Sequence, residues 1–378
     1  MLANAHPPAR CLAAFVVCSV LCLATWQTQA EIRQVESPSW QGEDLYYFEN
    51  STLSNLNFDE VDLAKAVVFA KETQSDSLII IRRGKIVVEQ YWNGKTREDV
   101  QQMYSSTKSP FSFLIGRLIA QSKIRGLDQP LVEILPEMKG ESLERITFRG
   151  LMAMASGLEQ SRTIDVKDRQ RESTQLQSVL NRSVTSDPLT KYHYNNAGYR
   201  AMFTALERAT GNTLHEITTK ELFEPLGMKG AYWVELHSGE RFIGYQSIRM
   251  RPLDMAKIGQ IMIDNGSWNG DTFLDPKFIA ELVRPIPGDV NPSYGLLWHL
   301  NGKYYKGYYV PTLINRKPLE GTPSDAFFNY GSGGQVLVCV PSLELVWVRT
   351  GSEMPYSMYQ PTSTLSRLSS LICQSIRK

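Results

Sequence analysis

The spacing of apolar residues predicts a helix followed by a β-hairpin near the start of the chain. In residues 59–73 (DEVDLAKAVVFAKET), apolar side chains recur at the intervals of one helix face. Residues 77–91 (SLIIIRRGKIVVEQY) contain two β-branched runs on either side of Arg83, Gly84 and Lys85, a pattern typical of a hairpin. The start of the folded chain is therefore expected to contribute two paired strands to a sheet.

The middle of the chain has a different pattern. From residue 106 to about residue 268 it is mostly helical, with Pro and Gly as breaks. Strand signals then return in residues 294–300, 302–310, 335–340 and 343–351, and residues 363–376 again have helical spacing. Strands near both ends with helices between them predict an α+β fold, in which one sheet is built from both termini and holds an inserted helical domain.

This pattern also gives domain boundaries. We expect residues 31–104 and 270–378 to form the sheet domain, and residues 105–269 to form a mainly helical domain that opens with a helix starting near residue 105. A crevice between two such layers is a usual place for a ligand site.

The first thirty residues have the layout of a secretory signal peptide. Arg10 precedes the apolar run of residues 11–25, and the small residue Ala30 marks the expected cleavage site. A retained membrane anchor is the alternative, but about fifteen mostly apolar residues are short for a span. We expect removal of residues 1–30 and a periplasmic or secreted protein. The remaining cysteines, Cys339 and Cys373, can pair in an oxidising compartment, although two free thiols are the reading we favour.

Composition excludes several classes of protein. Lys and Arg (40) balance Asp and Glu (39), so the chain has no net field that would attract nucleic acid or an anionic membrane. Two cysteines after signal removal are too few for a disulfide scaffold or a Cys-rich zinc site. His215 has no second histidine at zincin spacing. We expect no metal and no cofactor, and the sequence leaves the oligomeric state open.

A lysine stands in an unusual place in residues 102–121 (QMYSSTKSPFSFLIGRLIAQ). Ser105 and Lys108 are three residues apart, and a helix starting near Ser105 would put them on one face. Lys108 would lie at the positive end of the helix dipole, which disfavours its charged form. Burial would lower its pKa further, and a neutral lysine can take a proton from a serine. Ser106 is the rival nucleophile, but it lacks this spacing to a lysine. A plain Ser cap with an exposed Lys is the structural alternative.

Two further motifs carry groups suited to acyl transfer. Tyr194 and Asn196 precede a predicted helix, so the phenol can shuttle a proton and the amide can donate to the substrate or to Lys108. Their structural alternative is a helix cap. Residues 329–340 (NYGSGGQVLVCV) place Gly331, Gly333 and Gly334 before a strand, where glycines allow close backbone approach. Gly333 and Gly334 are candidate substrate-binding residues, with the Gly334 N–H as a second oxyanion donor. A bulge or tight turn is the alternative.

Ser-x-x-Lys, Tyr-x-Asn and a Gly-rich strand, in this order, resemble the penicillin-recognising serine hydrolases, which include class C β-lactamases, DD-peptidases and related esterases and amidases. The resemblance covers most of the chain after the signal and extends to residues 146–159, 194–211, 222–233, 251–270 and 294–300. It implies an antiparallel five-stranded sheet flanked by helices. It also implies Ser105 as the acylated nucleophile, Lys108 as its base, Tyr194 as the proton shuttle and Asn196 as an orienting donor.

One motif departs from this pattern. Where β-lactamases and DD-peptidases have Lys-Thr-Gly, this chain has Gly331-Ser332-Gly333, and so lacks the lysine that helps to bind substrate carboxylates. Its Gly-x-Gly-Gly-Gln is similar to that of 6-aminohexanoate-dimer hydrolases and some family esterases. The expected function is hydrolysis of a small ester or amide. A class C-type β-lactamase or D-amino-acid peptidase is the alternative, and a catalytically silent cell-wall-binding protein is a second.

Other readings of the sequence are less favoured. A Ser-His-Asp hydrolase would need the nucleophile elbow Gly-x-Ser-x-Gly, which is absent from the sequence. The remaining histidines read as capping, surface or core positions. Several aromatic residues near the expected site would either shape an acyl pocket or, more commonly, pack the core: Tyr104, Tyr192, Trp233, Tyr294 and Trp298.

Overall fold

The computed structural model describes residues 32–44, 48–140, 142–161, 163–164, 167, 174–238, 241–288, 290–306, 313–353 and 363–377. The predicted signal peptide lies outside these residues. Residues 32–378 form one compact unit. The division of this unit at residues 104 and 269 therefore stays a prediction.

The main sheet has seven strands in the order β10-β13-β14-β15-β3-β4-β2. Their bounds are β10 (His299–Leu300), β13 (Phe327–Gly331), β14 (Gln335–Val340), β15 (Leu345–Gly351), β3 (Ser75–Arg82), β4 (Lys85–Tyr91) and β2 (Glu49–Asn50). β15 pairs with β3 from Leu345↔Arg82 onward, which confirms a sheet built from both ends of the chain. The five longer strands are antiparallel, as expected. The two-residue strands extend the edges, and β2 runs parallel to β4, so the sheet is mixed.

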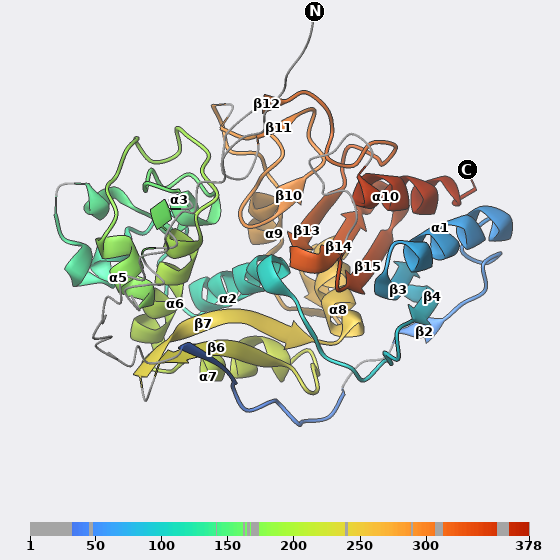
Figure 1. Cartoon of the computed structure of the whole chain (residues 1–378), viewed down its shortest axis with the longest axis horizontal. Helices are drawn as coiled ribbons and strands as arrows, with labels where there is room; N and C mark the ends of the chain where they lie inside the picture. Colours follow the sequence, from blue (N-terminus) through green and yellow to red (C-terminus); the bar gives the residue numbers. More distant parts are fainter. Residues whose placement is uncertain are drawn as a thin grey trace, which may run out of the picture. The chain divides into compact units, whose positions relative to one another are not determined.

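Helices cover both faces of this sheet (Figure 1). α1 (Glu60–Glu72) and α10 (Thr364–Gln374) pack on one face, where their apolar side chains meet those of β3, β14 and β15. α8 (Pro252–Ile263) packs on the other face. A Cβ on Gly259 would lie 2.6 Å from side-chain atoms of Leu337 and Val346, so glycine lets α8 approach the sheet closely.

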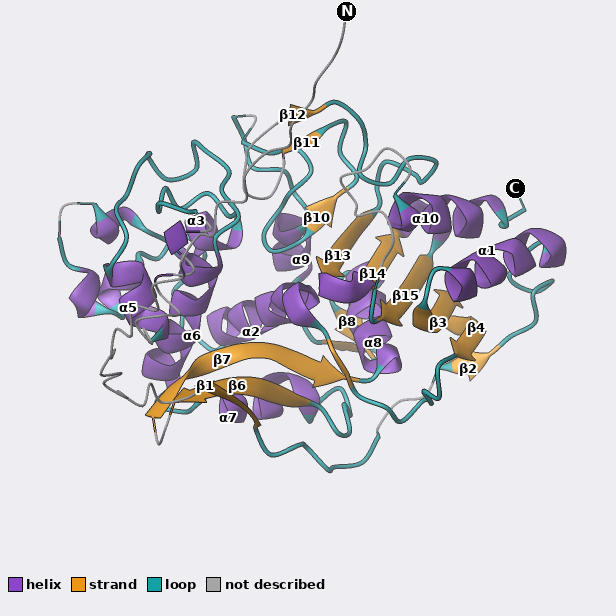
Figure 2. Cartoon of the chain, in the orientation of Figure 1, coloured by secondary structure: helices purple, strands orange, loops and turns teal. Residues whose placement is uncertain are grey.

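A second sheet was not expected in the predicted helical region. It has the order β1-β6-β7-β5, with bounds β1 (Ile32–Glu36), β6 (Tyr232–Ser238), β7 (Arg241–Met250) and β5 (Gln101–Gln102). Figure 2 shows β6 and β7 as the longest strands of this sheet. Their pairing shifts register at Val234/Glu235 and Leu236/His237, and these bulges break the alternation by which a strand is recognised.

The remaining elements are short or lie between the sheets. The other helices are α2 (Lys108–Ala120), α3 (Phe148–Met152), α5 (Gln175–Leu180), α6 (Asn196–Thr210), α7 (Leu214–Thr218) and α9 (Pro276–Leu282). Two small hairpins pair β8 (Ser267–Trp268) with β9 (Asp271–Thr272), and β11 (Tyr305–Lys306) with β12 (Leu313–Ile314).

The strand expected over residues 294–300 is much shorter than predicted, and the strand expected over residues 302–310 can be followed only as far as residue 306. Only His299–Leu300 and Tyr305–Lys306 are strands, and residues 307–310 lie outside the described part. Leu297 has a φ of 64°, and its N–H donates to the Met152 carbonyl, so the chain turns here instead of extending. The hairpin and the helices expected near both ends match β3, β4, α1 and α10 closely.

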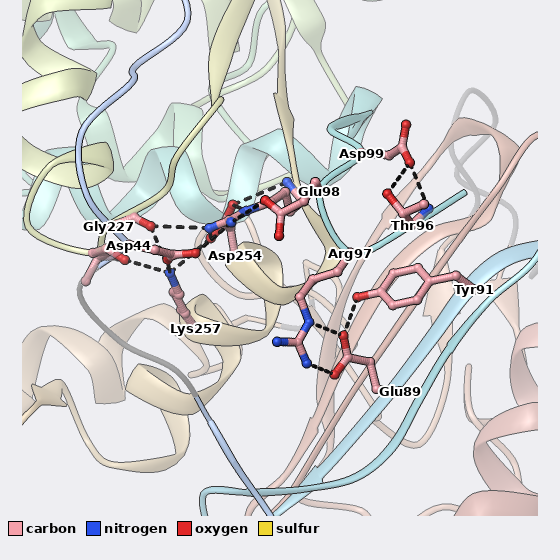
Figure 3. A network of polar contacts seen from close by, with 12 residues as sticks. Asp44, Glu89, Tyr91, Thr96, Arg97, Glu98, Asp99, Gly227, Asp254 and Lys257 are labelled. Atoms are coloured by element: carbon pink, nitrogen blue, oxygen red, sulfur yellow. Dashed lines mark hydrogen bonds and ion pairs between the residues drawn. The ribbon is translucent and has the colours of Figure 1, made fainter. Parts of the chain in front are cut away.

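The N-terminal segment joins the second sheet to α8. After β1, backbone hydrogen bonds link Ser37 to Trp233 and Trp40 to Ala231, which continues the path along β6. The segment then reaches Asp44, whose side chain is 9% exposed and binds both Arg251 and Lys257. Figure 3 shows Asp44 facing Lys257 beside the Gly227 carbonyl.

Candidate active site

The candidate nucleophile lies in a tight turn that leads directly into α2. The turn is a 3-10 helix, η1 (Tyr104–Thr107), and Lys108 is the first residue of α2. Tyr104 has a φ of 47°, a left-handed conformation that is costly for a non-glycine residue. The predicted helix start near Ser105 is therefore confirmed, and Lys108 Nζ lies 3.4 Å from Ser105 Oγ.

Lys108 is buried and has aromatic neighbours. Its side chain lies over the rings of Tyr194 and Tyr199, with Nζ 4.9 Å and 4.6 Å from their centroids. Burial, together with the smaller effect of the positive charge of Arg200, lowers the pKa of Lys108 to about 7. In the described part of the chain, Lys108 forms no ion pair that would hold its proton. This environment suits a general base near neutral pH.

Ser106 has a different environment from Ser105. It is fully buried, and its hydroxyl lies 2.6 Å from the Gln335 carbonyl and 3.0 Å from Asn329 Oδ1. These contacts tie η1 to β13 and β14. Ser105 is partly exposed and faces Lys108, so the geometry favours Ser105 over its rival as nucleophile.

The Tyr-x-Asn motif divides into structural and candidate functional residues. Asn195 caps α6, because its Oδ1 accepts from the Gly198 N–H at 2.9 Å. Tyr194, which is 3% exposed, places its ring beside Lys108. Asn196 is the first residue of α6 and is half-buried. The cap reading thus holds for Asn195. Tyr194 lies beside Lys108, and its role as proton shuttle stays a prediction.

The glycine-rich motif forms the turn between β13 and β14. A Cβ on Gly331 would lie 2.3 Å from the Met103 carbonyl oxygen, so this glycine lets β13 press against η1. Gly333 and Gly334 have φ angles of 75° and 80° in the following turn. The motif therefore contains both features that the sequence left open, a glycine that allows close backbone approach and a tight turn. The oxyanion role of Gly333 and Gly334 stays a prediction.

Three neighbours of Lys108 were not anticipated from the sequence. Tyr199 and Arg200 lie on α6, one turn after Asn196, so helical spacing offered a signal for both. His299 comes from β10 and stacks on Phe328 at 5.0 Å. Burial and the nearby charge of Lys108 lower the pKa of His299 to about 3, which keeps its imidazole neutral. No local sequence signal connects His299 with Lys108.

Most of the aromatic residues expected near the site pack the core instead. Trp233 and Trp298 are fully buried, and Tyr192 and Tyr294 are nearly so. Tyr104 is the exception at 43% exposed. Cys339 and Cys373 are free thiols, as favoured.

The described residues contain no cluster of three or more His, Cys, Asp or Glu side chains that could hold a metal ion. No helix within the described ranges is long and apolar enough to span a bilayer.

Comparison with known proteins agrees with this geometry. The profile of the family named Beta-lactamase matches residues 62–357, most of the chain. The chain belongs to the beta-lactamase family. Among curated members, a provisionally assigned D-alanyl-D-alanine carboxypeptidase of Salmonella paratyphi A is 22% identical over 298 residues, covering 60% of this chain and 68% of that protein.

Similar solved structures confirm the fold. A provisionally assigned 6-aminohexanoate-dimer hydrolase from Bacillus anthracis superimposes with a TM-score of 0.65 at 20% identity, covering 92% of this chain and 90% of that one. A family VIII carboxylesterase gives a TM-score of 0.57 at 16% identity, covering 83% of this chain and 97% of that one. These similar proteins are named as a carboxypeptidase, a hydrolase of the 6-aminohexanoate dimer and a carboxylesterase, so the comparisons do not choose among these activities for this chain.

Proposed function

We propose that this protein is an exported serine hydrolase that cleaves a small ester or amide through an acyl-enzyme on Ser105. The observation that carries the proposal is the pairing of a partly exposed Ser105 hydroxyl with a buried lysine whose pKa is lowered to about 7. Export rests on the signal-peptide layout of residues 1–30, which lie outside the described residues.

The reaction would proceed in two halves. Neutral Lys108 accepts the Ser105 proton while Oγ bonds to the substrate carbonyl carbon, which gives a tetrahedral oxyanion. The proton then passes by way of the Tyr194 phenol to the leaving alcohol or amine as its bond to carbon breaks. Water repeats the sequence on the acyl-enzyme and releases the acid. Asn196 would orient the substrate, and the turn containing Gly333 and Gly334 would donate to the oxyanion.

The substrate class follows from the glycine-rich turn. Gly331-Ser332-Gly333 supplies no cation for a substrate carboxylate, which argues for a neutral ester or a linear amide. One observation favours the runner-up, a β-lactamase or D-amino-acid peptidase. Arg200 is half-buried and close enough to lower the pKa of Lys108, so it offers a positive charge near the site.

Assays on purified protein would test the proposal. Short-chain p-nitrophenyl esters, the linear aminohexanoate dimer and a chromogenic cephalosporin would be compared. We expect ester or amide turnover, slow or no cephalosporin turnover, and loss of at least about a thousandfold in Ser105→Ala. Ser106→Ala is the matched control. It should keep fluorophosphonate labelling and most of its activity, and lose about 1–2 kcal/mol of stability with its hydrogen bonds.

Each contrary outcome has a clear meaning. Rapid cephalosporin turnover would replace the esterase and amidase reading with the β-lactamase one. If labelling is lost in Ser106→Ala but kept in Ser105→Ala, Ser106 rather than Ser105 is the nucleophile. A wild-type protein that neither turns over nor becomes labelled would be a binding protein.

A further inference from the structure

Arg349, in the middle of β15, is a fully buried cation whose described partners are all neutral. Its guanidinium donates five hydrogen bonds of 2.7–3.0 Å, to Ser75 Oγ and to the carbonyls of Gly333, Gly334, Thr73 and Glu353. Burial lowers the pKa of Arg349 to about 10, so it remains charged at neutral pH. The negative charge of Asp76 favours the charged form of Arg349, but no carboxylate in the described part of the chain accepts a hydrogen bond from it. Burying a charge in this way is costly and calls for a specific reason.

Two of the carbonyls that accept hydrogen bonds from Arg349 belong to the glycine-rich turn. One nitrogen of Arg349 binds both the Gly333 carbonyl at 3.0 Å and the Gly334 carbonyl at 2.8 Å. Gln335 adds a third contact, because its Nε2 lies 3.2 Å from the Ser332 carbonyl. Three successive carbonyls of the turn are thus held by side-chain donors.

Fixing these carbonyls also fixes the N–H groups of the turn. In a planar trans peptide, the C=O of one residue points opposite to the N–H of the next. Holding the Ser332 and Gly333 carbonyls therefore directs the N–H groups of Gly333 and Gly334 away from Gln335 and Arg349. Ser332 opens the 3-10 turn η6 (Ser332–Gly334), and Gly333 within it is left-handed with φ 75° and ψ −1°. A left-handed residue that follows a right-handed one lets successive N–H groups form an anion-binding nest.

The two strands that this turn connects, β13 and β14, both contact the nucleophile turn. Gly331, the residue before it, is so close to η1 that a Cβ there would lie 3.0 Å from the Ser106 nitrogen. The Ser106 hydroxyl binds the Gln335 carbonyl on the far side of the turn. The turn thus joins two residues that contact the nucleophile turn, and the oxygen of a tetrahedral intermediate on Ser105 would need donors close by.

We propose that Arg349 is a positioning residue for acyl transfer, which orients and polarises the N–H groups of the Ser332–Gly334 turn toward the developing oxyanion. The inference rests on the proposed function. Because the oxyanion forms only in the transition state, loss of Arg349 should lower kcat and leave KM nearly unchanged.

The test compares two buried arginines of the same sheet. Arg349→Lys keeps a positive charge but loses the fork that binds several carbonyls. Arg82→Lys is the matched control, because Arg82 on β3 is also buried and donates to the carbonyls of Leu56 and Leu343, neither of which belongs to the turn. We expect both variants to lose similar thermal stability. Only Arg349→Lys should lose kcat, by tenfold or more, with KM within about threefold.

Inhibition by a boronic acid provides a measurement that would not change if the role of Arg349 were purely structural. Its adduct with Ser105 is tetrahedral and carries an anionic oxygen, so its inhibition constant should rise in Arg349→Lys about as much as kcat/KM falls. If Arg349→Lys fails to fold, Ser75→Ala removes one anchor of the guanidinium and should lower kcat two- to fivefold with the same boronate signature.

The outcomes separate the inference from the proposed function. If wild-type turnover depends on Ser105 but Arg349→Lys behaves like Arg82→Lys, or loses affinity for substrate rather than kcat, the inference about Arg349 is wrong and the hydrolase stands. If the wild-type protein shows neither turnover nor fluorophosphonate labelling, the proposed function fails and the role of Arg349 fails with it.

Discussion

At the scale of single residues, the protonation state of Lys108 sets when the site can work. The amine must be neutral to accept the Ser105 proton, and a lysine becomes neutral as pH rises through its pKa. With that pKa lowered to about 7, kcat/KM should rise with pH and level off above about 8. At pH 6 it should be about a tenth of the plateau, because one pH unit below the pKa leaves about a tenth of the base neutral.

Arg200 provides a second check on this reasoning. Its positive charge disfavours a protonated Lys108, so Arg200→Gln should raise the pKa and move the kcat/KM profile to higher pH. Arg208→Gln is the control on the same helix, since Arg208 pairs with Glu137 at the surface. A profile that is flat from pH 5 to 9, or one that shifts equally in both variants, would rule out Lys108 as the titrating base.

At the scale of elements, the sequence predicted those helices and strands whose apolar residues follow a regular local pattern. Regular apolar spacing identified α1, the β3–β4 hairpin, β14, β15 and α10. The i, i+3 spacing likewise identified Ser105 with Lys108. The bulged strands β6 and β7 were missed because a shift in register destroys the period of two. His299 was not connected to Lys108 because only the pairing of β10 with β13 brings it into the core beside the site.

The close contact between β13 and η1 predicts that adding one methyl group, at Gly331, will disturb the site. Gly331→Ala would place a Cβ 2.3 Å from the Met103 carbonyl oxygen, which is backbone and cannot rotate away. The nucleophile turn must shift, and a displacement of about 1 Å can cost a hundredfold in rate. We therefore expect kcat to fall by about that factor. Gly126→Ala should be silent, because nothing lies within 4 Å of a Cβ there. Near-normal kcat in Gly331→Ala would show that this contact does not position Ser105.

At the scale of the whole molecule, a buried charge cluster links the N-terminal segment, the second sheet and the main sheet. Asp44 binds Arg251 at 2.6 Å and Lys257 at 2.9 Å, and both cations also bind Asp254 (Figure 3). Lys257 further donates to the carbonyls of Leu226 and Gly227. α8 carries Asp254 and Lys257 and packs on the main sheet. Asp44 therefore links the N-terminal segment, which runs along β6, to the main sheet, which contains the glycine-rich turn between β13 and β14.

Removing the charge of Asp44 should therefore lower the free energy of unfolding of the protein. Asp44→Asn keeps the shape but leaves two buried cations with one buried carboxylate, and breaking such a pair typically costs about 3–5 kcal/mol. Urea unfolding at pH 7 would measure the loss. Glu49→Gln is the control, because Glu49 is 78% exposed and its ion pair with Lys85 should contribute little to stability.

The pH dependence of this loss tests its electrostatic origin. Burial alone would raise the pKa of Asp44, but hydrogen bonds from Arg251 and Lys257 outweigh burial and hold it below the ordinary value of 3.8. A carboxyl group with a lowered folded-state pKa stabilises the protein above its ordinary pKa and loses that contribution as pH falls through the folded value. The stability difference between the wild-type protein and Asp44→Asn should thus be constant from pH 5 to 8 and shrink below 3.8. A difference that persists unchanged at pH 3 would mean that Asp44 acts through shape and hydrogen bonding rather than charge.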